Sequence, residues 1–255
     1  MDNAAATLPG QSVSFPPFAG FTGRGVRIAV IDSGAHPGHP HIAADRLEPG
    51  IAVEADGTIN TAPDAWLDQV GHGTAVTAAI QEMAPDAHCI PIRVFRQSLR
   101  TTSVALLAAI RWATTQRIDV VNLSLGSHNK AHREAFAEAV AATTAAGIVI
   151  VAARSADDMP CYPGALPHVI GAELDWDCPR AECWIDRTLD PPVLHAAGYP
   201  RPIAGVPQRR NLHGISFAVA QISGFAARGC EALGPRSGVK PILQAFLQQA
   251  DGQRH

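Results

Sequence analysis

Residues 25–32 read GVRIAVID, a short apolar run that is rich in β-branched residues and ends in an acid. An apolar run without polar alternation is typical of a strand that is buried on both faces. Strands of this kind belong to parallel sheets, and open parallel sheets hold their ligands at the carboxyl ends of the strands. The stretch therefore predicts a buried parallel strand that presents Asp32 at its functional end.

Helical and strand-like patterns alternate along the rest of the chain. Apolar residues at helical spacing predict helices over 73–84, 103–116, 131–147, 216–233 and 239–250. Short apolar runs predict further strands over 87–95, 118–126, 148–153 and 168–172. Ser103 is expected to cap the second helix and Gly147 to end the third. This alternation predicts an α/β domain with a mostly parallel sheet that is flanked by helices on both faces.

Residues 155–215 differ from the alternating segments on either side. They are rich in proline, aspartate, arginine and cysteine and show weak periodicity, which predicts long surface loops. No linker separates them from the rest of the chain. We therefore expect a single domain over 25–255, preceded by an N-terminal extension over 1–24.

The composition excludes several classes of function. The 255 residues carry a formal net charge of −3 and the sequence pI is near 6.4, which argues against nucleic acid or an anionic membrane as partner. No apolar run approaches the ~20 residues that span a bilayer. The first residues have neither the basic nor the apolar region of a secretory signal, so a cytoplasmic location is expected.

The cysteines give little support for a metal site. The chain has five, and Cys161, Cys178 and Cys183 fall close together without the paired spacing of metal ligands. We expect free thiols, with a disulfide between Cys178 and Cys183 as the alternative. No metal and no cofactor are expected.

Three residues with complementary chemistry stand at strand ends and helix starts. Asp32 ends the first strand, His72 precedes a helix within GHGTAV, and Ser216 begins a helix within HGISFA. A serine hydroxyl becomes a nucleophile when a neutral imidazole takes its proton, and a carboxylate orients that imidazole and stabilises its cation. Each residue alone has a simpler interpretation as a turn, core or cap residue. Together they indicate acyl transfer, with the backbone N–H of Ser216 facing the developing oxyanion.

Six segments in order resemble motifs of the subtilisin family of serine peptidases. They read VRIAVIDSGAHPGHPHI, GHGTAVTAAI, MAPDAHCIPIRVF, VVNLSLG, YPGALPHVIGA and HGISFAVAQISGFAA, and they run from about Gly25 to Ala227. The chain order Asp, His, Ser is also that of subtilisin. The resemblance implies a subtilisin-like fold, a catalytic triad of Asp32, His72 and Ser216, and a peptide or protein as the substrate.

The resemblance also implies how the substrate is bound. Ser124, Leu125 and Gly126 in VVNLSLG would pair backbone to backbone with an extended peptide and line its first specificity pocket. The histidine-rich run HPGHPH at 36–41 would be a variant substrate-side loop rather than a metal site. His41 stands at the position of an aspartate that binds calcium in many secreted relatives, so the resemblance implies that one calcium ligand is missing.

The chain departs from the family pattern at the oxyanion hole. Ala156 replaces the family asparagine that follows the strand VIVAA, and Ser155 stands in place of a glycine. Alanine has no side-chain donor, and loss of that donor in subtilisin lowers kcat by about 10²–10³. Ser155, Arg154 and His213 are candidate substitute donors, beside the backbone N–H of Ser216.

We predict a serine endopeptidase that hydrolyses a narrow set of peptides, such as the leader of a precursor peptide. A catalytically weak or inactive peptide-binding module of the same fold is the first alternative, because of Ala156. A transamidating peptide macrocyclase is the second, although no helical insert near His72 supports it. A lipase-type hydrolase is a weak third, because the G-x-S-x-G elbow is missing. The sequence leaves the oligomeric state open.

Overall fold

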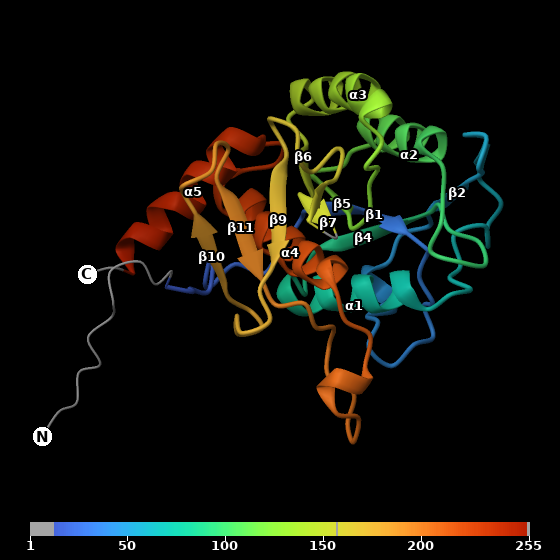
Figure 1. Ribbon diagram of the computed structural model, residues 1–255. Coiled ribbons are helices and arrows are strands. Elements are labelled where there is room, and N and C mark those ends of the chain that lie inside the picture. Colours follow the sequence, from blue (N-terminus) through green and yellow to red (C-terminus); the bar gives the residue numbers. More distant parts are fainter. Residues whose placement is uncertain (1–12, 157, 254–255) are drawn as a thin grey trace, which may run out of the picture.

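The computed structural model describes residues 13–156 and 158–253 (Figure 1). One sheet has nine strands in the order β10-β11-β9-β6-β5-β1-β4-β2-β3, and every neighbouring pair is parallel except the edge pairs β10–β11 and β2–β3. A separate hairpin pairs β7 with β8. The strands are β1 Arg27–Asp32, β2 Ile51–Val53, β3 Ile59–Asn60, β4 His88–Arg93, β5 Val120–Leu123, β6 Val149–Ala153, β7 Ser155–Ala156, β8 Met159–Pro160, β9 Ile170–Leu174, β10 Cys183–Asp186 and β11 Val193–Ala196.

Helices cover both faces of the sheet, and each face has its own hydrophobic core. Alternate residues of a buried strand point to opposite faces, so Val30 of β1 belongs to the first core and Ile31 to the second. The first face carries α1 His72–Met83, α4 Ile215–Leu233 and α5 Val239–Gly252, and the second carries α2 Ser103–Thr115 and α3 Arg133–Ala145. Short 3₁₀ helices cover Ala44–Arg46, Lys130–His132 and Gln208–Arg210. The predicted α/β class with a mostly parallel sheet is confirmed.

The predicted helices and strands are present, with ends that shift by a few residues. The cap of α2 is a correction: Thr102 precedes the helix and accepts a hydrogen bond from the N–H of Ala105 (3.1 Å), whereas Ser103 is the first helical residue. Gly147 follows α3 with φ of +77°, a left-handed conformation that favours glycine and ends helices. Three adjacent residues, Thr101, Thr102 and Ser103, carry hydroxyls, and Thr102 is the one with the extended backbone of an N-cap (φ −101°, ψ 155°).

The expectation of long surface loops over 155–215 is wrong in part. β10 and β11 lie in this segment and extend the main sheet beyond β9. In β10 the buried Cys183 and Ile185 alternate with the partly exposed Trp184. Each of the two strands has four residues, a length over which alternation is hard to tell from an irregular segment. The short pair of β2 and β3 escaped prediction for the same reason.

The described part of the expected N-terminal extension, residues 13–24, packs against the domain. The N–H of Phe15 donates to the carbonyl of Cys183 (2.9 Å) at the outer edge of β10. Phe18 is buried, and its ring packs edge-on against Phe246 of α5. Residues 1–12 lie outside the described residues, so the division of the chain at residue 24 stays a prediction.

All five cysteines are buried free thiols, so the alternative disulfide between Cys178 and Cys183 is not formed in this structure. Burial raises the pKa of Cys89 to about 12 and that of Cys161 to about 11, which keeps these thiols protonated at neutral pH. Within residues 13–156 and 158–253, no three metal-ligating side chains gather into a site. No helix of this described part has the length and apolar character needed to cross a membrane.

Candidate active site

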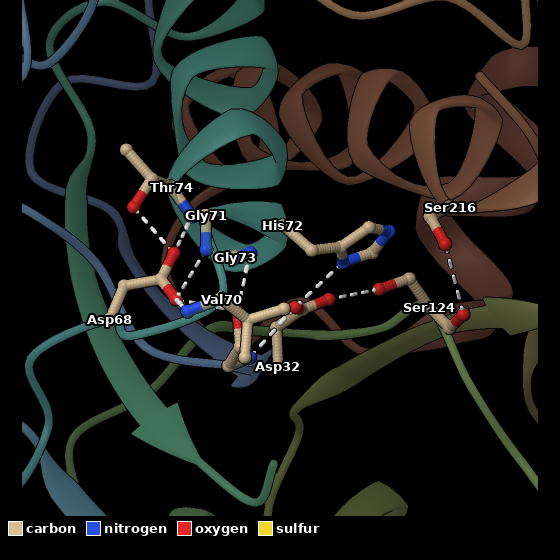
Figure 2. A network of polar contacts seen from close by, with 10 residues as sticks. Asp32, Asp68, Val70, Gly71, His72, Gly73, Thr74, Ser124 and Ser216 are labelled. Atoms are coloured by element: carbon tan, nitrogen blue, oxygen red, sulfur yellow. Dashed lines mark hydrogen bonds and ion pairs between the residues drawn. The ribbon is translucent and has the colours of Figure 1, made fainter. Parts of the chain in front are cut away.

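Asp32, His72 and Ser216 lie together at the carboxyl edge of the parallel sheet (Figure 2). Asp32 is the last residue of β1, His72 the first of α1 and Ser216 the second of α4. Gly71 and Gly214 precede the two helices with φ of +90° and +142°, a region that glycine adopts without strain. The fold thus brings together the three residues whose chemistry the sequence singles out.

A buried carboxylate orients the imidazole. Asp32 is fully buried, and its Oδ1 lies 2.8 Å from Nδ1 of His72. The same oxygen accepts the N–H of Ser33 (2.7 Å), and Oδ2 accepts the hydroxyl of Ser124 (2.8 Å). Because an ionised carboxylate can only accept, Nδ1 of His72 carries a proton, and Nε2 of the neutral ring is an acceptor.

The hydroxyl of Ser216 lies on the far side of the His72 ring from Asp32 (Figure 2). Among the described residues its hydrogen bond goes to the carbonyl of Ser124, at 3.4 Å, rather than to His72. The rings of His72 and Phe217, the residue after Ser216, have centroids 5.8 Å apart, so α1 and α4 begin side by side. Hydrogen bonds between a nucleophile and its base are often long in a free enzyme and tighten when substrate binds.

Gly73 allows α1 to begin close to the loop that follows β1. A Cβ at this position would lie 2.3 Å from the carbonyl oxygen of Gly34. That separation is far shorter than a van der Waals contact, so a larger residue would push His72 away from Asp32. The N–H of Gly73 also donates to the hydroxyl of Ser33 (2.8 Å), which ties the helix start to the strand end.

Asp68 is a fourth polar residue of the site, and the sequence motifs did not single it out. Its Oδ1 accepts the hydroxyl of Ser33 (2.9 Å) and the N–H of Gly71 (2.9 Å), while Oδ2 accepts the N–H and the hydroxyl of Thr74 at 2.8 and 2.6 Å. Figure 2 shows Asp68 and these bonds at the start of α1, with Ser216 on the other side of the His72 ring. A carboxylate four residues before the histidine, at a helix N-terminus, is the signal that would have found it.

Much of the chain matches a known protein family. Residues 23–170, more than half of the sequence, match the model of the subtilase family. The chain belongs to this family. The matched region contains Asp32 and His72 and ends before Ser216.

Curated relatives and a solved structure agree with this assignment. Subtilisin DY of Bacillus licheniformis is 31% identical over 143 residues, which are 52% of this chain and 48% of that protein. Human membrane-bound transcription factor site-1 protease is 32% identical over 149 residues, which are 56% of this chain and 13% of that protein. A crystal structure of a cold adapted subtilisin-like serine proteinase matches with a TM-score of 0.63 at 22% identity, covering 90% of this chain and 82% of that one. The subtilase therefore has a subtilisin-like fold. The matched part of the chain covers about half of the length of subtilisin DY and a smaller part of site-1 protease.

The surroundings of His72 in this subtilase favour the protonated ring. Burial lowers the pKa of His72, but the hydrogen bond to Asp32 and the negative charges of Asp32 and Asp68 outweigh it and raise the pKa above its usual value. For Asp68, burial raises the pKa, but the hydrogen bonds from Thr74 and Gly71 outweigh it and lower the pKa. Asp68 is therefore ionised at neutral pH, and His72 is a stronger base than a free imidazole.

The side-chain donors expected near Ala156 have other partners in the subtilase. The hydroxyl of Ser155 donates to the carboxylate of Glu173 (2.9 Å), and the guanidinium of Arg154 pairs with the same carboxylate at 3.9 Å. Ala156 follows Ser155 in β7 and has no side-chain donor. In this structure the side chains of Arg154 and Ser155 therefore point toward Glu173.

Two further donor positions stand at the start of α4. Nδ1 of the exposed His213 lies 3.1 Å from the carbonyl of Asn211. The backbone N–H of Ser216 lies in the first turn of α4, a helix of 19 residues whose dipole is positive at this end. A fixed N–H at a helix start needs no rearrangement to meet an anion, so Ser216 is the stronger candidate.

Ser124, Leu125 and Gly126 follow β5, which ends at Leu123, three residues before the predicted strand end. Ser124 is buried, and it contacts both Asp32 through its hydroxyl and Ser216 through its carbonyl. A Cβ on Gly126 would lie 2.4 Å from the carbonyl oxygen of Tyr162, so this segment packs closely against the chain after β8. The segment lies next to Ser216, while its pairing with a peptide stays a prediction.

Replacement of Asp68 by asparagine should lower the free energy of unfolding by about 2 kcal/mol at neutral pH, because charged hydrogen bonds to Ser33, Gly71 and Thr74 weaken. The pKa of Asp68 is lowered in the fold, so its contribution is present above the usual carboxyl pKa and is lost as pH falls through the folded value. Urea unfolding of the wild type and of the Asp68→Asn protein should therefore show a difference in the free energy of unfolding that becomes smaller below about pH 4.

The matched control is Asp64→Asn, because Asp64 is exposed in the same loop and the change in charge is identical. It should leave the free energy of unfolding within about 0.5 kcal/mol of the wild type. Equal stability of the two variants would contradict the role given to Asp68.

Proposed function

We propose that this subtilase is a serine endopeptidase that hydrolyses peptide bonds through Asp32, His72 and Ser216. The observation that carries the proposal is the contact of 2.8 Å between the fully buried carboxylate of Asp32 and Nδ1 of His72, with Ser216 across the ring. A buried carboxylate that fixes one ring nitrogen leaves the other as a base for a serine on the opposite side. The protease names of the relatives subtilisin DY and site-1 protease support the same reaction class.

The proposed reaction begins with attack of Ser216 Oγ on the carbonyl carbon of the scissile bond. Nε2 of His72 takes the hydroxyl proton and later gives it to the leaving amine, while Asp32 stabilises the imidazolium. The acyl-enzyme is then hydrolysed by water, which His72 activates in the same manner. The N–H of Ser216 stabilises the oxyanion in both steps, with the positive end of the α4 dipole behind it.

A cavity beside the segment that precedes α4 supports the proposal of a narrow set of peptide substrates. Three aromatic side chains, Trp176, Tyr199 and His213, line this cavity of about 500 Å³ together with Arg209. The centroid of the Trp176 ring lies 5.1 Å from that of Tyr199 and 5.9 Å from that of His213. Figure 1 shows that the orange segment before α4 projects away from the sheet. An aromatic wall at this position suits an apolar side chain, and a precursor-peptide leader is the substrate that we propose.

A second function, peptide binding without cleavage, is favoured by one observation. Ala156 offers no side-chain donor, and the hydroxyl of the adjacent Ser155 is bonded to Glu173. An oxyanion hole with one N–H donor would slow acylation by about 10²–10³ relative to a complete one. A chain of this kind would still bind an extended peptide beside Ser124, Leu125 and Gly126.

Reaction with a fluorophosphonate probe, followed by intact-mass and peptide mapping, separates the two functions. These probes react with a serine only when its base and oxyanion donors are assembled. We expect one probe per chain, attached to Ser216. A folded protein that takes up no probe would contradict the peptidase proposal and leave peptide binding as the function.

The rate of fluorophosphonate labelling should rise with pH with a midpoint above the usual histidine pKa of about 6.5. The neutral ring of His72 is the active base, and the negative charge of Asp32 and Asp68 holds the pKa of this ring above its usual value. The rate is to be measured from about pH 5 to about pH 10, over the range in which unfolding assays show a stable protein. A midpoint at or below that of a free imidazole would contradict the assigned surroundings of His72.

A further inference from the structure

A polar cavity of about 570 Å³ opens between the ends of β2 and β4 and the segment 96–101. Arg93, Arg96 and Arg100 line it, and among the described residues Glu54 is the one acidic side chain that does so. The cavity therefore carries an excess of positive charge, although the formal net charge of the whole chain is −3. A concentration of cations in an acidic chain points to an anionic ligand.

Two of the three guanidinium groups have no carboxylate partner among the residues that the structure describes. Arg96 forms an ion pair with Glu54 at 2.8 Å. Within residues 13–156 and 158–253, neither Arg93 nor Arg100 takes part in an ion pair. Nε of Arg93 is buried and has no hydrogen-bond acceptor in this described part of the chain. A buried donor of a cation that lacks an acceptor destabilises the protein, and a bound anion would remove this cost.

The cavity lies next to the candidate active site. Arg93 pairs in register with Asp32 on the neighbouring strand, so both side chains point to the same face of the sheet. Gln69, three residues before His72, lines both this cavity and the neighbouring groove between the loops that precede α1 and α4. The cavity and this groove therefore meet at Gln69, in the loop that leads to His72.

We infer that this cavity binds the carboxylate side chain of an aspartate or glutamate that flanks the scissile bond of the peptide. The peptide nature of the ligand rests on the proposed function, and the charge preference rests on the arginines. A guanidinium binds a carboxylate through two parallel N–H···O bonds, and Arg93 and Arg100 both have donors to offer. A basic side chain would meet like charge, and an apolar one would leave the buried N–H of Arg93 without an acceptor.

Phage selection with a random octapeptide library tests this inference without the need for cleavage. The immobilised protein carries Ser216→Ala, so that bound peptides stay intact. We expect aspartate or glutamate to be enriched at one position of the selected peptides. The best peptide and its twin with glutamine in place of the acid are then compared by fluorescence anisotropy, where the acid should bind about tenfold more tightly. The difference should shrink in about 1 M salt.

Two arginine variants in the same background assign the effect to the cavity. Arg100→Gln changes an exposed side chain and should leave the fold intact while it removes most of the preference for the acid. Arg93→Gln should remove the preference as well. Arg111→Gln on α2 is the matched control, because it makes the same change in charge on an exposed residue outside the cavity. Equal binding of the two peptides, a preference that survives Arg100→Gln, or no selected peptide would each overturn the inference.

The outcome is separable from that of the proposed peptidase function. If the wild-type protein reacts with the fluorophosphonate probe but peptides with and without the acidic residue bind equally, the inference is overturned and the peptidase function stands. A protein that does not react but selects acidic peptides keeps the inference as a property of a peptide-binding module. Inorganic phosphate at millimolar concentration serves as a competitor, and competition that depends on Arg100 supports an anion site.

Discussion

The Ser216→Ala protein should fold normally, take up no fluorophosphonate and hydrolyse peptides about 10⁶-fold more slowly in kcat than the wild type. The hydroxyl of Ser216 is the nucleophile, and alanine leaves His72 and Asp32 in place with nothing to activate. The side chain of Ser216 is half-buried, and the one hydrogen bond that it forms with the described residues, to the carbonyl of Ser124, is long at 3.4 Å. Its loss should therefore change the free energy of unfolding by less than about 1 kcal/mol.

Ser237→Ala is the control for this experiment. It makes the same chemical change just beyond the other end of α4, where the hydroxyl bonds the carbonyl of Gly234. The control protein should react with the probe at the wild-type rate. Probe uptake by the Ser216→Ala protein, with intact-mass analysis placing the adduct on another residue, would remove Ser216 from the proposed mechanism.

Replacement of Asp32 by asparagine should lower kcat by about 10⁴ while Ser216 and His72 remain. The carboxylate accepts three donors, from Ser33, His72 and Ser124. An amide has one oxygen and one NH₂ group, so its NH₂ must face either the ring nitrogen of His72 or the hydroxyl of Ser124. If it faces the ring, Nδ1 becomes the acceptor and the proton moves to Nε2, where it blocks the base.

Rates of probe labelling for the wild type and the Asp32→Asn protein measure this effect, with urea unfolding to confirm the fold. Asp64→Asn in the exposed loop again serves as the charge-matched control. A rate within tenfold of the wild type would show that Asp32 does not orient His72.

The start of the domain and the candidate triad are readable from local patterns. The apolar run before Asp32 indicates a strand because a buried parallel strand needs no polar alternation, and glycines mark the helix starts before His72 and Ser216. The order of these residues along the chain, together with their motifs, indicates one site. Such features depend on a few neighbouring residues, so they can be recognised in one sequence without knowledge of the fold.

Contacts between distant segments depend on packing, which local patterns do not encode. β10 and β11 are too short for periodicity to reveal, and they form strands because β9 offers an edge to pair with. The hydroxyl of Ser155, a candidate oxyanion donor, is bonded to Glu173, 18 residues away in sequence. The same limit applies to the cap of α2, where Thr101, Thr102 and Ser103 all carry hydroxyls and the path of the chain makes Thr102 the cap.

Local patterns are enough to predict an α/β domain and to place Asp32, His72 and Ser216 where strands end and helices begin, because residue periodicity and glycine positions are properties of short segments. Folding of the chain brings Asp68 to Ser33, 35 residues earlier in the sequence, and places Glu54 and Gln69 in the same cavity as Arg93. Those groupings arise when β4 pairs beside β1 and the following loop folds back over the strand end. Charge and hydrogen bonding act through space, so residues far apart in sequence become partners only after the sheet has formed.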